Sequence, residues 1–155
     1  MPAPTPPPSQ TRPRIFVDAD VLFAGSASPS EHGASLVLLR MAEITLIEAC
    51  ISQQVLHEVE RNLAEKLPQA LPVFRLIASR CLHVTPDPTP DEVQVYTGLA
   101  QASDLPILVA ALQAGCPWLV TFNLRHYRPG HPAVQVLPPG DFLLRVRDLL
   151  ALLGR

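Results

Sequence analysis

Acidic and amide side chains occur where regular elements of this chain are expected to begin or end, and on one expected helix. They are Asp18, Asp20, Glu58, Glu60, Asp104 and Asn123. Carboxylate and amide oxygens suit hard cations such as Mg²⁺ or Mn²⁺ better than they suit zinc. Clustered carboxylates repel one another unless a cation compensates their charge. If the fold brings these residues together, they form the kind of site that metal-assisted hydrolysis of a phosphodiester requires.

Each of these residues also has an ordinary structural interpretation. Asp18 follows the apolar run 15–17, where an unpaired buried carboxylate is costly, although Asp18 and Asp20 together also suit a turn. If that segment stays extended, the two carboxylates face the same side, because side chains alternate along a strand. Asp104 suits the start of a helix, and Asn123 suits a turn after a strand.

The segment 52–66 has the apolar spacing of an amphipathic helix, and Ser52 is a suitable N-cap for it. At about 100° per residue, Glu58 and Glu60 lie on opposite sides of its apolar stripe. The helical wheel alone slightly favours Glu60 as the residue at the boundary with the core. Either glutamate taken alone is typical of a solvated helix surface.

Apolar runs and capping signals predict the elements that would position these side chains. Strands are expected at residues 14–17, 46–51, 81–85, 118–121 and 134–137. Helices are expected at residues 28–42, 52–66, 68–79, 89–102, 106–114 and 141–153. Two of these helices begin in capping boxes, at residues 28–31 and 89–92, and Gly115 suits the position that ends another.

The predicted strands alternate with helices, and they are short, apolar and mostly without a polar alternation. That pattern is typical of a parallel sheet covered by helices on both faces. We therefore expect an α/β fold, a three-layer α/β/α sandwich with a mostly parallel central sheet of four to five strands. Ligands of such sheets bind beyond the carboxyl ends of the strands, which is where Asp18 and Asn123 stand.

The composition indicates one folded domain preceded by a tail. The chain has 155 residues, of which 48% are hydrophobic and 17% charged, enough to bury a core. Residues 1–13 hold six of the eighteen prolines. We expect a flexible Pro-rich tail there, with a wrongly chosen start codon as the alternative. Residues 14–153 are expected to form the single domain.

Charge and hydropathy limit the classes of protein. A net charge of −2 argues against a polybasic nucleic-acid binder, though not against an enzyme that acts locally on nucleic acid. No apolar run reaches the roughly 18 residues of a membrane span, and the N-terminus lacks a secretory pattern. The three cysteines form no CxxC motif and are typical of small core residues in a reduced protein. We expect a cytoplasmic protein with no membrane association.

Four segments resemble motifs of the PIN domain, a family found in many nucleases and in the toxin halves of toxin–antitoxin operons. These segments are residues 15–22 (IFVDADVL), 51–63 (ISQQVLHEVERNL), 104–115 (DLPILVAALQAG) and 119–127 (LVTFNLRHY). Residues 134–143 resemble the family's last strand and helix, so the resemblance covers roughly residues 14–150. The second match puts the acidic ligand at Glu58 rather than Glu60.

The chain departs from the family's pattern at three positions. Ala19 and Asp20 stand where Thr and Asn usually follow the first aspartate. The first change removes a hydroxyl and the second adds a carboxylate. The fourth acidic position is Asn123, a neutral oxygen ligand that is common in one branch of the family regarded as toxin components.

The resemblance implies a metal-dependent endoribonuclease that hydrolyses phosphodiester bonds in single-stranded or looped RNA, as the toxin of a toxin–antitoxin pair. The implied catalytic residues are Asp18, Glu58, Asp104 and Asn123. The first three would hold Mg²⁺ or Mn²⁺, with Asp20 as an auxiliary carboxylate. Arg125 and Arg128 would contact the RNA backbone, and His126 is interpreted as structural. The implied partners are the RNA substrate, a cognate antitoxin and, as is common in the family, a second copy of the chain.

Other classes remain as alternatives. A catalytically weak or inactive PIN-like module that binds RNA or a protein partner is favoured by Asn123 and by the net charge. Residues 18–22 also resemble the first motif of haloacid dehalogenase phosphatases, with Asp18 as nucleophile and Asp20 as acid–base. The only lysine, Lys66, has no matching context for that family. No Gly-rich loop follows the first strand, which disfavours a nucleotide-binding Rossmann protein.

Overall fold

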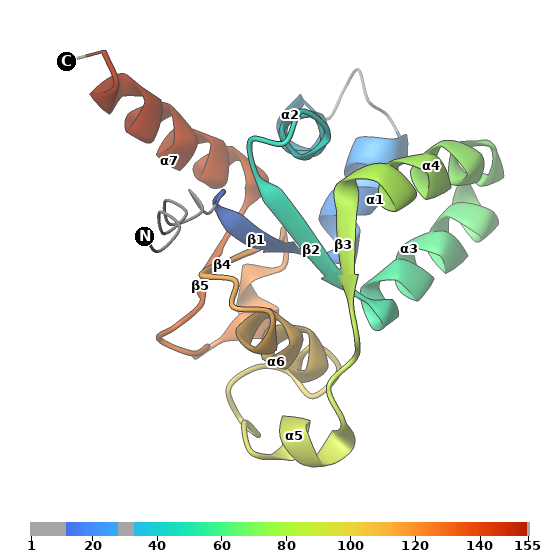
Figure 1. The fold of residues 1–155 in the computed structure, drawn as a ribbon. Coiled ribbons are helices and arrows are strands. Elements are labelled where there is room, and N and C mark those ends of the chain that lie inside the picture. The colour runs from blue at the N-terminus through green and yellow to red at the C-terminus, as the bar shows by residue number, and fades with distance from the viewer. Residues whose placement is uncertain (1–11, 28–32, 155) are drawn as a thin grey trace, which may run out of the picture.

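Five short strands form the central sheet of the computed structural model, which describes residues 12–27 and 33–154. The strands are β1 Arg14–Val17, β2 Glu48–Ser52, β3 Leu82–Thr85, β4 Trp118–Val120 and β5 Gln135–Leu137. All pair in parallel, in the order β3-β2-β1-β4-β5 (Figure 1). β1 lies in the middle of the sheet, where Phe16 is opposite Cys50 of β2 and Leu119 of β4.

Helices cover both faces of this sheet. They are α1 Ala19–Ala27, α2 Gly33–Glu43, α3 Gln53–Lys66, α4 Leu71–Cys81, α5 Pro90–Gln94, α6 Leu105–Gln113 and α7 Pro139–Leu152, with 3₁₀ helices η1 Pro68–Ala70 and η2 Leu124–Tyr127. α1, α2, α3 and α4 gather on one side of the sheet, and α6 lies on the other (Figure 1). The predicted three-layer α/β/α sandwich with a parallel sheet is therefore confirmed.

The apolar character of the strands follows from this double covering. Ile15, Phe16 and Val17 of β1 are all fully buried, as are Leu63 of α3 and Leu108 of α6. A parallel strand with helices on both faces buries successive side chains rather than every second one. Such a strand offers no solvent-facing position until it ends, so the first polar residue after it lies at the edge of the sheet.

Local signals place several helix ends as predicted. The Ser52 hydroxyl accepts the backbone N–H of Val55 at 3.3 Å and caps α3. Gly115, with a φ of 68°, takes the left-handed conformation that ends α6. The capping box of α5 is present, because Thr89 Oγ1 accepts from the Glu92 N–H at 3.2 Å.

Other predicted bounds are wrong. The helix expected to run to residue 102 ends at Gln94, because the chain continues in turns around Gly98, whose φ is 94°. The helix expected at residues 68–79 is divided into η1 and α4. The capping box at residues 28–31 and nearly all of the expected tail lie outside the described residues.

Two further observations concern the whole described part of the chain. No helix there has both the length and the apolar character needed to cross a membrane. Cys50, Cys81 and Cys116 are free thiols, of which Cys50 and Cys116 are buried in the core and Cys81 is half-buried.

Candidate active site

Asp18 is the buried centre of the polar residues at the carboxyl edge of the sheet. It directly follows β1, its own N–H donates to the Val120 carbonyl at 3.0 Å, and it is only 6% exposed. Its Oδ1 accepts from the Ala19 N–H at 2.8 Å. Its Oδ2 accepts from the Thr121 hydroxyl at 2.9 Å and from the Tyr127 hydroxyl at 2.8 Å. These three donors offset the cost of burying the carboxylate and fix its orientation.

Asp20 and Asp18 both lie near the Thr121 hydroxyl, but the segment that joins them is not extended as predicted. The chain does not stay extended after β1 but turns into α1 at Ala19, because both aspartates accept N–H groups of the first helical turn. The Asp20 Oδ2 accepts from the Phe122 N–H at 2.9 Å and lies 3.4 Å from Thr121 Oγ1. Burial, followed by the charge of Asp18, raises the pKa of Asp20 to about 6.

Glu58 and Glu60 lie in different surroundings on α3. Burial raises the pKa of Glu58, and the charges of Asp18 and Asp104 raise it further, while Arg61 opposes the shift. Glu60 instead forms an ion pair with Arg75 of α4, with 3.1 Å between Oε2 and Nη2. The helical wheel slightly favours Glu60 as the core-boundary residue, but Glu58 is the glutamate that shares an electrostatic environment with the aspartates.

Asp104 occupies the N-cap position of α6 without acting as a side-chain cap. Its carboxylate accepts no capping N–H, and its Oδ2 instead lies 2.9 Å from Nδ1 of His126. Burial and the charge of Asp18 raise the pKa of Asp104, and His126 lowers it. The helix-cap interpretation therefore does not account for this carboxylate.

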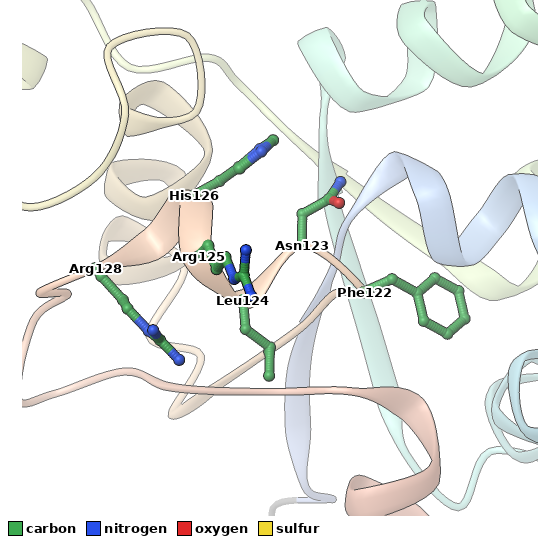
Figure 2. Close-up of a pocket in the computed structure, with 6 residues that line it drawn as sticks. All are labelled: Phe122, Asn123, Leu124, Arg125, His126 and Arg128. Carbon is green, nitrogen blue, oxygen red and sulfur yellow. The ribbon is translucent and has the colours of Figure 1, made fainter.

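Asn123, Arg125 and Arg128 line a cavity of about 290 Å³ on and around η2, together with Phe122, Leu124 and His126 (Figure 2). Asn123 is exposed, and its backbone N–H donates to Thr121 Oγ1 at 3.0 Å. The side chains of Asn123 and His126 project to the same side of the turn, and the ring of Phe122 points away from them (Figure 2). Both arginines are exposed.

Comparison with known families identifies the family of this chain. The PIN domain family matches residues 14–125, which is most of the folded part of the chain. The chain belongs to the PIN domain family. At this coarse level it is a member of a family of nucleases. No curated protein shows significant sequence similarity to it.

Solved structures share the fold of this PIN domain at low sequence identity. The chain is similar to one from VapBC2 of Rickettsia felis bound to a promoter DNA fragment, with 16% identity and a TM-score of 0.58, covering 79% of this chain and 96% of that one. It is also similar to VapC20 of Mycobacterium tuberculosis, described as a sarcin-ricin loop cleaving toxin. That match has 19% identity and a TM-score of 0.50, and covers 68% of this chain and 86% of that one.

The candidate metal ligands of this PIN domain are carboxylate and amide oxygens, the donor types that hard divalent cations prefer. Burial, followed by the charge of Asp18, raises the pKa of Asp20, Glu58 and Asp104, so these carboxylates repel Asp18 when they are ionised. A cation would relieve that repulsion. In the described part of the chain, however, no three His, Cys, Asp or Glu side chains are close enough together to hold a metal ion directly. Metal binding would therefore need either water-mediated contacts or an inward movement of these carboxylates.

Sequence reasoning gave no role in the site to Thr121 or Tyr127, and it interpreted His126 as structural without naming its partner. Thr121 and Tyr127 donate to Asp18, and His126 pairs with Asp104. Tyr127 has the sequence signal of a packing aromatic, and its ring is indeed 2% exposed. The one available signal is Thr121, a polar residue that directly follows the buried strand β4, as Asp18 directly follows β1.

Proposed function

We propose that this PIN domain is a metal-dependent endoribonuclease that cleaves single-stranded or looped RNA, and that it acts in the cytoplasm as the toxin of a toxin–antitoxin pair. One observation supports the catalytic part most directly. Asp18 is buried at the carboxyl edge of the sheet and shares the Thr121 hydroxyl with Asp20, and burial, followed by the charge of Asp18, raises the pKa of Asp20, Glu58 and Asp104. Family membership supports the reaction class.

The residues have distinct proposed roles. Asp18, Glu58 and Asp104 hold Mg²⁺ or Mn²⁺, with Asp20 as an auxiliary carboxylate. A bound divalent ion would activate a water molecule and offset negative charge on the scissile phosphate. Asn123 orients the phosphate or the attacking water through its amide.

Neighbouring side chains assist these groups. Arg125 and Arg128 donate to phosphates of the RNA backbone from the cavity that they line. Thr121 and Tyr127 keep Asp18 in place, and His126 keeps Asp104 in place.

The proposed toxin role implies a protein partner. The similar chain from Rickettsia felis was solved as part of VapBC2, and the similar VapC20 is described as a toxin. We propose that a cognate antitoxin is encoded beside this chain and covers its acidic edge. Co-expression with the neighbouring short reading frame should yield a complex that does not cleave RNA. A homodimer is a separate expectation, which the mass of the purified protein in solution would test.

A second candidate is a PIN-like module that binds RNA or a protein partner without cleaving it. Two observations favour it, namely the neutral Asn123 at the fourth position and the spacing of the described carboxylates, which do not close around an ion. Such a module would bind labelled RNA without shortening it, in the presence or absence of a divalent ion.

Cleavage of labelled single-stranded RNA separates the two candidates. The purified protein is incubated with Mg²⁺, with Mn²⁺ or with EDTA. The double variant Asp18→Asn/Asp104→Asn, purified in the same way, controls for contaminating ribonuclease. Cleavage that needs both the metal and the two aspartates supports the nuclease. Cleavage by the double variant, or none by the parent, contradicts it.

A further inference from the structure

Phe122 is unusual among the aromatic residues of this protein. The chain has five phenylalanines, two tyrosines and one tryptophan, and all of them lie within the described residues. Phe122 is the exposed one, with 50% of its surface accessible, whereas the others are buried or half-buried. A single exposed apolar side chain is ordinary on protein surfaces, so only the position of this ring can distinguish it from others.

The backbone of Phe122 is held against the acidic residues. Its N–H donates to Asp20 Oδ2 at 2.9 Å. The preceding hydroxyl, Thr121 Oγ1, donates to Asp18 at 2.9 Å and accepts the Asn123 N–H at 3.0 Å. The Cα of Phe122 therefore has a fixed place beside one proposed metal ligand, Asp18, and the auxiliary carboxylate, Asp20. Only the two side-chain torsions of Phe122 remain free, so the side chain loses little conformational entropy when a ligand packs against its ring.

The ring and the arginines lie on different sides of Asn123. Arg125 and Arg128 line the cavity around η2, and although Phe122 also lines it, its ring points away from the other side chains (Figure 2). Within the described residues the ring stacks on no other aromatic ring and on no cation. Because 50% of the surface of Phe122 is also accessible, the ring is available to a ligand that extends beyond Asn123.

We infer that Phe122 is a stacking platform for one unpaired base of the RNA, on the opposite side of the cleaved phosphate from the nucleotides whose phosphates contact Arg125 and Arg128. This inference rests on the proposed ribonuclease function. Bases stack on exposed aromatic rings with little sequence preference, whereas a base inside a duplex has both faces covered by its neighbours. The platform therefore selects RNA with an unpaired nucleotide next to the cleavage site. It also supplies affinity that does not depend on positive charge, in a protein whose net charge is −2.

Kinetics of four variants test this role. Phe122→Ala removes the ring, Phe122→Leu keeps an apolar side chain without the flat face, and Phe122→Trp keeps the face. Leu76→Ala, on α4 and also 50% exposed, is the matched control for loss of an exposed apolar side chain. We expect the Ala and Leu variants to raise KM about tenfold with little change in kcat, and the Trp variant and the control to behave like the parent.

A binding measurement without turnover makes the same test independently. A short RNA carrying 2-aminopurine at one position is titrated with protein in EDTA, and the labelled position is moved along the strand. The parent and Phe122→Trp should quench the fluorescence at one position, and Phe122→Ala and Phe122→Leu should not. Removing the base at that position should weaken binding to the parent about tenfold and leave binding to Phe122→Ala unchanged.

The outcomes separate failure of this inference from failure of the proposed function. If the parent cleaves RNA in a metal-dependent way while KM and quenching are unaffected by Phe122→Ala, the inference that Phe122 stacks on a base is wrong. The proposed nuclease function is then still supported. If the parent neither binds nor cleaves RNA, both are wrong. If Phe122→Ala abolishes capture of the co-expressed antitoxin while KM for RNA is unchanged, the ring is a protein contact and the inference is overturned.

Discussion

The Tyr127 hydroxyl donates a hydrogen bond to Asp18 Oδ2 at 2.8 Å, across 109 residues of sequence. Burial and the nearby carboxylates raise the pKa of Tyr127, so the phenol stays protonated and serves as a donor. The tyrosine thus has two roles at once, since its ring fills the core and its hydroxyl satisfies a buried charge.

Replacing Tyr127 with Phe should destabilise the protein by about 2 kcal/mol, because a hydrogen bond to a buried charged group is lost while packing is kept. Urea unfolding measures the effect. Tyr96→Phe is the control, since the Tyr96 ring is half-buried and packs edge-on against the His131 ring rather than on a buried carboxylate. Equal losses in the two variants would show that the Asp18 contact contributes nothing.

The two glutamates of α3 provide a matched pair for activity. Glu58→Gln should lower metal-dependent cleavage about 100-fold, because a proposed metal ligand loses its charge. Glu60→Gln should leave cleavage unchanged, because Glu60 pairs with Arg75 instead. Cleavage rates at several Mn²⁺ concentrations distinguish lost metal affinity from lost turnover. A larger effect at Glu60 would refute the assignment.

Stability should depend on pH in a direction set by the acidic residues. The pKa of Asp20 is raised from 3.8 to about 6, and those of Glu58 and Asp104 are raised as well. At a pH between the ordinary pKa of the unfolded chain and the raised pKa of the folded state, the folded protein binds more protons than the unfolded chain. The contribution of these groups to the free energy of unfolding is therefore present at low pH and is lost as pH rises through about 6.

Thermal unfolding in EDTA and in Mn²⁺ tests this dependence. In EDTA the parent should lose stability between about pH 4.5 and 7 relative to Asp20→Asn, which carries no titrating group at that position. Mn²⁺ should raise the melting temperature of the parent more at pH 7 than at pH 5, because ionised carboxylates bind it more tightly. If the melting temperatures of the parent and of Asp20→Asn depend on pH in the same way in EDTA, Asp20 does not cause the predicted loss of stability.

Gly25 of α1 packs closely against α2. A Cβ at this position would lie 2.8 Å from Leu39 Cδ1 and 3.4 Å from the Ser35 backbone. Overpacking costs about 1–3 kcal/mol, which exceeds the roughly 0.5–1 kcal/mol that alanine gains over glycine in a helix. Gly25→Ala should therefore destabilise the protein. Gly140→Ala, in α7 with nothing within 4 Å of the added Cβ, should be neutral or slightly stabilising by the same urea assay.

The elements that depend on local patterns could be predicted from the sequence. β1 follows from its apolar run, and the start of α3 follows from the Ser52 cap. α1 was not predicted, because its apolar residues Val21 and Leu22 do not distinguish helix from strand over so short a run. The helix after Thr89 was predicted too long, because turns in the next residues overrule the pattern that follows a correct cap.

The candidate site divides in the same way. Asp18, Asp104 and Asn123 stand next to predictable element boundaries, so their placement at one edge of the sheet follows from a parallel topology. The partners of these residues could not be predicted, because contacts such as Thr121 with Asp18 join segments about a hundred residues apart. Distinguishing Glu58 from Glu60 required either the family resemblance or the position of α4, whose Arg75 engages Glu60.

The order of the site along the chain has a consequence for protein synthesis. Asp18 is translated early, but Thr121 and Tyr127, which hold it, follow 103 and 109 residues later. A nascent chain in which β4 has not yet left the ribosome lacks one of the two strands that pair with β1. Such a chain also lacks Asn123. The candidate site therefore assembles only once translation has passed Tyr127, and a fragment released earlier lacks the two hydroxyl donors that hold Asp18.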